Sequence, residues 1–248
     1  MTKPQRRVRL PILLWAVLPL GIGPLQIFLK AYLPDVYDAT MKGELGLVEN
    51  LTVVSLVVAF VTALLLLRHR RSVASPLFGP FCVVMALGCF FFAGEEASWG
   101  EHWFGFEVPE EIAERNDQHE FNIHNDPFFE NFLDQPPRLA LTIFAFVGGV
   151  LIPLRKRRRG ESDRPRFDGD GIWGWFWPTI ECLPSGLVAA TITLPKKIAR
   201  AALGHVPEPL HIGPGETKEL AIGLFLMIYL LMMLLELRAQ EAEARQAG

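Results

Sequence analysis

The sequence predicts an all-α fold: a polytopic transmembrane helix bundle of about six spans, forming a single integral membrane domain over residues 1–248. Half of the residues are hydrophobic. They lie in runs that approach the ~20 helical residues needed to cross a hydrocarbon core about 30 Å thick. Between these runs, basic clusters alternate with acidic connections. Because lipid offers no hydrogen-bond partners to the backbone, each run is expected to be helical.

Six apolar runs are the expected spans, at residues 10–33, 47–67, 77–94, 138–154, 172–194 and 219–237. The first run contains Pro19 and Pro24, which predict a kinked helix. It follows a basic N-terminus, as a secretory signal would, but no small-residue cleavage site comes after it. We therefore interpret it as a span. The second run is the most continuous, and the third leads directly into a polar motif.

The fifth run is the least regular of the six. It contains Pro178, Pro184 and the charged residue Glu181. Because proline interrupts helical hydrogen bonding, this run is either a broken span or a re-entrant segment. The sixth run is apolar throughout and leads into a charged tail.

Three basic clusters fix the expected orientation; they lie at residues 3–9, 68–71 and 155–159. The positive-inside rule places them in the cytoplasm, together with the N-terminus and the linker 155–171. The acidic loop 95–137 then lies outside the cytoplasmic (inner) membrane of a bacterium.

One basic group opposes this orientation. Lys196, Lys197 and Arg200 would lie outside if the fifth run crosses fully. If that run is only re-entrant, the C-terminus would lie outside instead. We expect six spans with both ends in the cytoplasm.

Two polar segments dominate the chain. The first, Gly94-Glu95-Glu96-Ala97-Ser98-Trp99-Gly100-Glu101-His102, follows the third run directly, and the second covers residues 116–125. If the helix continues past the interface, Glu95, Ser98 and Trp99 share one of its faces. A charge this close to an apolar span is costly, which favours a functional role for the glutamate pair.

Acids from three helix ends are expected to meet at the outer membrane face. Glu49 begins the second run, Glu95 and Glu96 end the third, and Glu219 begins the sixth. The predicted catalytic or substrate-orienting residues are Glu95, Glu96, Ser98, Asn122 and Asn125. The predicted metal ligands are Glu96, His119, Glu120, His124 and Glu219, because glutamate and histidine together suit Zn, Mn or Fe.

Structural roles are the alternative for several of these residues. Most acids of an outer loop are simply solvated, and Trp99 and Trp103 are typical of an aromatic interfacial belt. Glu181 either marks a functional position within an apolar run or lies in a wet gap between two prolines. The loop is also expected to contain short amphipathic helices: Pro109 followed by two glutamates predicts a helix start, and an aromatic patch near Phe128 suits an interface.

Other classes of protein are excluded by what the chain lacks. The basic clusters lie at membrane edges without aromatic residues suited to base stacking, so they indicate contact with anionic lipid rather than nucleic acid. Three cysteines give no disulfide framework. Gly148 and Gly149 in the fourth run predict close helix packing. Nothing in the sequence indicates the oligomeric state.

The paired motif Gly-Glu-Glu-x-Ser-Trp-Gly, followed by Asn-x-Gln-x-Glu-x-Asn-x-His-Asn from Asn116, resembles a family of bacterial polytopic membrane proteins of uncharacterised function. The resemblance extends to residues 44–49 and 216–219. It implies a shared site and no particular reaction. The adjacent glutamates are also similar to those of glutamate-type intramembrane proteases that process prenylated proteins, but those enzymes carry their histidines on later membrane helices.

The sequence thus favours a metal-assisted hydrolase or transferase that acts on a lipid or lipid-linked substrate at the outer face of the bilayer. A metal-bound water would be nucleophilic near neutral pH. Two alternatives are a transporter or ion-binding protein, with Glu181 on its path, and an assembly partner whose outer loop docks another protein.

Overall fold

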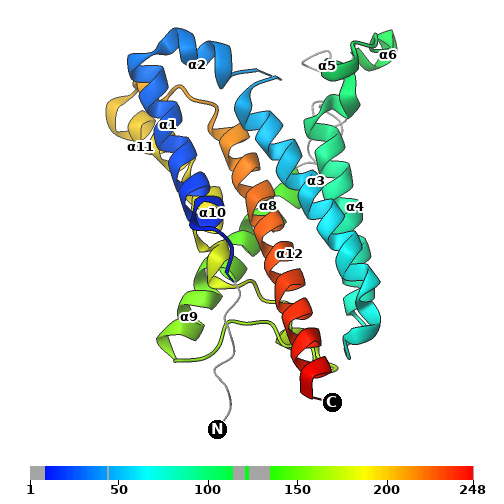
Figure 1. Ribbon diagram of the computed structural model, residues 1–248. Helices are drawn as coiled ribbons and strands as arrows, with labels where there is room; N and C mark the ends of the chain where they lie inside the picture. Colours follow the sequence, from blue (N-terminus) through cyan, green and yellow to red (C-terminus); the bar gives the residue numbers. More distant parts are fainter. Residues whose placement is uncertain (1–8, 44, 114–120, 123–134, 248) are drawn as a thin grey trace.

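The computed structural model describes residues 9–43, 45–113, 121–122 and 135–247. Every regular element in these ranges is a helix. Long helices run between the two ends of the bundle, and short helices connect or follow them (Figure 1). The prediction of an all-α fold is confirmed for the described residues.

The N-terminal half of the chain is built from long helices that alternate in direction. Its elements are the π-helical turn η1 (Leu13–Val17), α1 (Leu18–Tyr32), α2 (Pro34–Thr40), α3 (Leu47–Arg68), the short turn η2 (Arg70–Ser72) and α4 (Phe78–Glu96). After α4 come η3 (Ser98–Gly100), α5 (Glu101–Phe104) and α6 (Glu110–Ala113). Helix α6 starts directly after Pro109, as the sequence predicts. The aromatic patch near Phe128 lies outside the described residues.

The C-terminal half is less regular until its last helix. It contains α8 (Gln135–Phe146), the π-helical turn η5 (Val147–Leu151), α9 (Ile152–Arg158), η6 (Ile172–Gly174) and η7 (Ile180–Cys182). These are followed by α10 (Leu183–Thr191), α11 (Leu194–Leu203), η8 (Glu208–Leu210) and α12 (Pro214–Ala247).

Within the described residues, five helical segments are long and apolar enough to cross a membrane: Leu13–Tyr32, Leu47–Arg68, Phe78–Glu96, Gln135–Arg158 and Glu208–Gln246. They match five of the six predicted spans. The exposed perimeter of these helices is apolar, with Leu20, Val57, Leu87 and Ile143 each about half exposed, at 48%, 45%, 64% and 53%. An apolar surface of this extent is compatible with contact with lipid.

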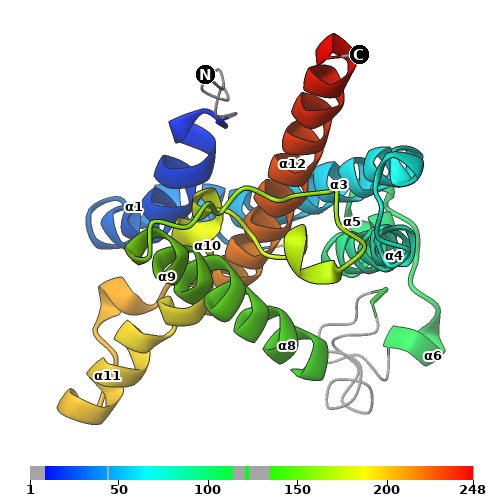
Figure 2. The ribbon, with the colours of Figure 1, turned by 90° about the horizontal axis from the view of Figure 1, so that it is seen from below.

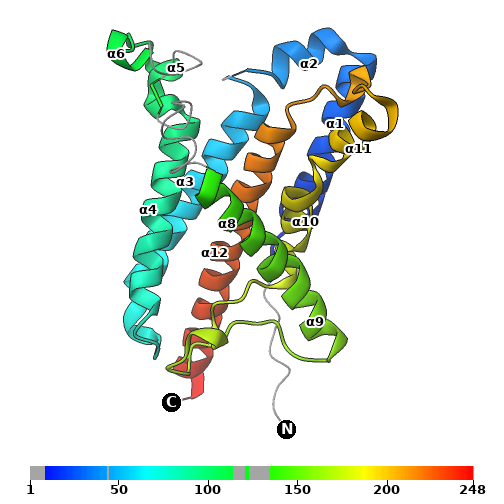
Figure 3. The same cartoon turned by 180° about the vertical axis from the view of Figure 1, so that it is seen from behind.

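The predicted fifth span differs from the others because it is not one continuous helix. Its longest helix, α10, has nine residues, a rise of only about 14 Å. Pro184 begins α10 and Pro195 begins α11, so each proline starts a new helix where it needs no backbone donor. The segment 172–213 nevertheless runs from the end of the bundle that carries the C-terminus to the opposite end (Figures 1 and 3).

Two of the long helical segments contain a π-helical turn at an equivalent place. Turn η1 ends two residues before Pro19, and η5 ends two residues before Pro153. Proline lacks a backbone N–H, and its ring clashes with the carbonyl four residues earlier. A wider turn relieves that clash without ending the helix.

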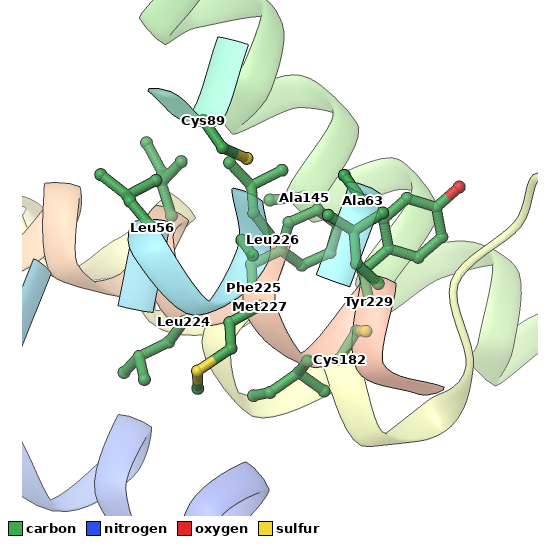
Figure 4. Packing of buried hydrophobic residues seen from close by; sticks show 14 of the residues in the cluster. Leu56, Ala63, Cys89, Ala145, Cys182, Leu224, Phe225, Leu226, Met227 and Tyr229 are labelled. Carbon is green, nitrogen blue, oxygen red and sulfur yellow. The ribbon is translucent and has the colours of Figure 1, made fainter. Parts of the chain in front are cut away.

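Helix α12 is the axis of the bundle. Most of its apolar stretch is buried, because α3 lies along one side of it and α10 and α8 lie along the other. A helix that is apolar on all faces is expected at such a central position. Figure 4 shows Phe225 and Tyr229 of α12 among Leu56 of α3, Ala145 of α8 and Cys182 of η7.

Glycines let α8 and η5 lie close to the segment 178–186, and this confirms the predicted role of Gly148 and Gly149. A Cβ at Gly149 would lie 2.7 Å from Cε2 of Phe225, and one at Gly148 would lie 3.3 Å from Cδ of Pro178. Across the same contact, a Cβ at Gly186 would collide with the backbone carbonyl oxygen of Ala145.

Replacing Gly186 with alanine is therefore expected to lower the free energy of unfolding by about 1–3 kcal/mol, the usual cost of overpacking. Gly88→Ala on α4 is the matched control, because a Cβ there meets nothing within 4 Å. That control is expected to be neutral or to stabilise by up to about 1 kcal/mol through helix propensity. Thermal unfolding of both variants in the same detergent measures the difference, and equal melting temperatures would contradict the close contact.

Candidate functional site

The first polar segment forms the end of α4 and the turn that follows it. Helix α4 ends at Glu96, and the chain turns through η3 with a different backbone conformation. The predicted shared face of Glu95, Ser98 and Trp99 required the helix to continue past the interface, and the helix does not continue past Glu96. The physical reason is in the backbone: Ser98, Trp99 and Gly100 have φ of 42°, 52° and 92°.

Positive φ is rare for residues other than glycine and costs free energy. Here two such residues precede Gly100, which adopts this conformation without a Cβ penalty. Strained backbone of this kind is found most often at functional sites. Its local effect is to turn the Trp99 side chain back along α4.

Trp99 covers the last turn of α4 and holds Glu95. A Cβ at Gly94 would lie 2.7 Å from Cζ3 of the indole, so the ring rests directly on this glycine. The Trp99 Nε1–H donates a hydrogen bond to Oε1 of Glu95 at 2.7 Å, and Phe90 and Phe91 contact the ring edge to face. Glu95 is only 3% exposed, so this donor compensates in part for burying a carboxylate.

The second polar segment returns to the first one. The backbone N–H of Phe121 donates a hydrogen bond to Oε2 of Glu101 at 2.7 Å. Next to it, Nδ2 of Asn122 donates to Oγ of Ser98 at 3.2 Å. Both Asn122 and Ser98 are buried. The two motifs, separated by about twenty residues of chain, therefore meet through paired hydrogen bonds.

The structure places four predicted site residues at this junction. Glu95, Ser98 and Asn122 are buried, and Glu96 is half-buried beside them. The predicted residues His119, Glu120, His124 and Asn125 lie outside the described residues. The pattern of the sequence did not predict that Glu101 and Ser98 bind the second segment. The four-residue spacing of Glu95 and Trp99 did indicate the contact between those two residues.

Glu219 lies on α12 and pairs with Arg138 of α8. Both side chains are largely buried, with 12% of the Glu219 side chain and 26% of the Arg138 side chain exposed. Glu219 was predicted from the sequence as a metal ligand, and no role was predicted for Arg138. A carboxylate neutralised by a guanidinium is a poor candidate for a metal ligand. The structure shows this pair as an ion pair that links the starts of α8 and α12.

The acids of three helix ends do lie at one end of the bundle. The start of α3 with Glu49, the end of α4 with Glu95, and the start of α12 with Glu219 are all at the end opposite the C-terminus (Figure 1). Among the described residues, no group of three or more His, Cys, Asp or Glu side chains is arranged to hold a metal ion.

Two charged pairs and one buried acid lie away from this junction. At the opposite end, Arg164 of the linker donates to Glu236 of α12 from Nη2 at 2.7 Å, and His69 lies 3.0 Å from Glu241. Within the bundle, Glu181 is 3% exposed and belongs to η7, which packs against η5, η1 and α12. Glu181 is thus surrounded by irregular helical turns.

The predicted resemblance to an uncharacterised membrane-protein family remains a prediction, and function has to be inferred from the site itself. Comparison of the chain with models of protein families, with curated proteins and with solved structures gives no match.

Proposed function

We propose that this chain is an integral protein of the bacterial cytoplasmic membrane that catalyses hydrolysis or group transfer on a lipid or lipid-linked substrate at the outer face. The observation that carries the proposal is the junction of the two polar segments, where Asn122 meets Ser98 beside the glutamate pair. Burying a carboxylate and two polar side chains at the edge of an apolar bundle is costly. Anchoring the chain in the membrane does not require a buried carboxylate and two buried polar side chains at this place.

The two glutamates are suited to different tasks. Glu95 is buried and held by the Trp99 indole, so its orientation is fixed. Glu96 is half-buried and accessible to a reactant. We assign Glu96 as the general base: it takes a proton from water, or from an acceptor hydroxyl, as that oxygen attacks the carbonyl or phosphoryl centre of the substrate.

The proton is then returned to the leaving group as its bond to the substrate breaks, so atoms and charge balance. Ser98 and Asn122 would orient the polar part of the substrate, because their hydrogen-bonding groups lie at the same junction. A Zn, Mn or Fe ion held by His119, Glu120 and His124, with Glu96 left unligated as the base, would supply Lewis acidity. The steps assigned to Glu96, Ser98 and Asn122 do not depend on that ion.

The test is an assay of the purified chain in proteoliposomes. The substrates are phosphatidylglycerol, phosphatidylethanolamine, a polyprenyl diphosphate and a prenylated peptide, and the products are identified by mass spectrometry. Turnover of one of them, with metal content measured on the same sample, supports the proposal. If no substrate in this set, and no component of a bacterial lipid extract, is converted, the catalytic proposal fails.

A second candidate, ion or proton transport, is favoured by the burial of Glu181 among irregular turns within the bundle. Buried acids inside membrane proteins often lie on ion or proton paths. Flux measured in liposomes with a pH-sensitive dye would support this candidate if it is present and is lost in Glu181→Gln. Wild-type flux in that variant would exclude Glu181 from the path. If neither turnover nor flux is found, an assembly role remains.

A further inference from the structure

Helix α11 projects from the bundle and has no buried residue. Viewed along the bundle it extends outward (Figure 2), and from the side it stays level with the end of α1 (Figures 1 and 3). Its ten residues, Leu194–Leu203, are followed by Gly204, whose φ of 75° ends the helix. The direction of α11 is thus across the bundle axis, unlike the long helices.

The two sides of α11 have opposite chemistry. Leu194 and Ile198 are four residues apart, so they share one face, and they are 43% and 62% exposed. Lys196 and Arg200 are four residues apart and lie on the opposite side, and Lys197, three residues before Arg200, lies on the flank between the two faces. An apolar face and a cationic face on one short helix are typical of helices that lie in the plane of a membrane interface.

We propose that α11 is an interfacial helix that binds the outer surface of the bilayer, with its apolar face among acyl chains and its three basic residues on anionic headgroups. The charge of the polar face complements phosphatidylglycerol, and each basic residue near an anionic surface contributes about 1 kcal/mol of attraction. Exposed apolar residues continue to the end of α1 that lies level with α11 (Figure 1), where Phe28 is 53% exposed and Tyr32 is 73% exposed. The inference depends on the orientation of the chain in the membrane and not on the proposed catalysis.

This position also accounts for the one feature that opposed the predicted orientation. Lys196, Lys197 and Arg200 lie at the end of the bundle that we assign to the outer side, against the positive-inside rule. That rule describes basic residues in loops near the ends of spans. Basic residues on a helix that lies on the bilayer instead gain direct contact with anionic headgroups, which offsets the unfavourable placement.

The experiment compares a position on the apolar face of α11 with a position on its basic flank, in the full-length protein. Ile198→Cys and Lys197→Cys are made with alanine at Cys82, Cys89 and Cys182, which are buried. Each is labelled with an environment-sensitive fluorophore in nanodiscs of phosphatidylglycerol and phosphatidylcholine. The label at position 198 is expected to emit at shorter wavelength, to lose quenching by aqueous iodide, and to be quenched by a shallow doxyl lipid. The label at 197 is expected to show the reverse.

A second comparison tests the headgroup preference. Doxyl-labelled phosphatidylglycerol should quench the label at 198 more than doxyl-labelled phosphatidylcholine does, and this difference should be lost when Lys196, Lys197 and Arg200 are all changed to glutamine. Leu194→Cys on the same apolar face replaces Ile198→Cys if the latter does not fold. Equal iodide quenching at 197 and 198 would overturn the proposal. So would protection from iodide without quenching by lipid, which would mean that protein covers the face.

Discussion

Replacing Glu96 with glutamine is expected to reduce turnover of the lipid substrate by at least about 100-fold, the lower range of what a general base contributes. Glutamine keeps the size and hydrogen bonding of the side chain but cannot accept the proton. The reduction should appear in kcat, with KM little changed, because the base acts in the transition state rather than in substrate binding. Initial rates in proteoliposomes over a range of substrate concentrations measure both constants.

Glu107→Gln is the matched control for this change. Glu107 is an exposed glutamate eleven residues further along the chain, after α5. It should keep wild-type kcat and KM. If Glu96→Gln retained wild-type kcat, Glu96 would not be the base, and a selective rise in KM would instead indicate a role in binding.

Breaking the ion pair between Arg164 and Glu236 is expected to give the largest loss of stability, about 3–5 kcal/mol for either single change to methionine. Nε and Nη2 of Arg164 both donate to Oε2 of Glu236, at 2.9 and 2.7 Å. Only 1% of the Glu236 side chain and 18% of the Arg164 side chain is exposed. The hydrogen bond to Glu236 also raises the pKa of Arg164. Removing Arg164 leaves the carboxylate of Glu236 buried without this guanidinium, and removing Glu236 takes away the strongest hydrogen-bond acceptor of Arg164.

The double variant with methionine at both positions distinguishes this explanation from simple loss of packing. It should recover most of the lost stability, because no uncompensated charge remains and the apolar side chains fill similar volume. Unfolding in detergent, followed by tryptophan fluorescence for the three variants and the wild type, gives the coupling free energy. Additive losses in the double variant would show that the two charges are not coupled.

The sequence predicted the helical class and five of the long helices because hydropathy alone reports a helix that must be apolar over its whole length. It indicated the break near Pro184 but not its outcome, since a broken segment can still pass from one end of a bundle to the other. Helix α11 begins where the predicted fifth span ended, at Leu194, and it was not predicted as a separate helix. Its amphipathic pattern is present in the sequence.

The site was predicted in part. Both motifs were recognised, and the spacing of Glu95 and Trp99 indicated a contact, but the contact forms through a turn in the left-handed region rather than through a continued helix. The bonds from Asn122 to Ser98 and from Phe121 to Glu101 join residues 24 and 20 positions apart. No local periodicity encodes such contacts. For the same reason, the pairing of Glu219 with Arg138 was not anticipated.

Disulfide formation in living cells tests most directly whether the two polar segments meet at the outer face of the membrane. In a background with alanine at the three native cysteines, the variant carries cysteine at Ser98 and Asn122, whose polar atoms lie 3.2 Å apart. The control carries cysteine at Arg166 and Gly174 near the opposite end, where the Cβ atoms would lie 3.9 Å apart, a suitable separation for a disulfide. A Cβ at Gly174 would also lie 2.9 Å from the carbonyl oxygen of Arg166, so the backbone must shift slightly to accept it. The bacterial periplasm is oxidising and the cytoplasm is reducing.

We expect the Ser98–Asn122 pair to be oxidised in cells without added oxidant, and the Arg166–Gly174 pair to be oxidised only after lysis with oxidant present. Thiol alkylation and a gel-mobility shift on rapidly quenched cells report both states. A Ser98–Asn122 pair that stays reduced in cells and becomes oxidised only after lysis would place the glutamate pair in the cytosol. A pair that resists oxidation even then would show that the two segments do not meet.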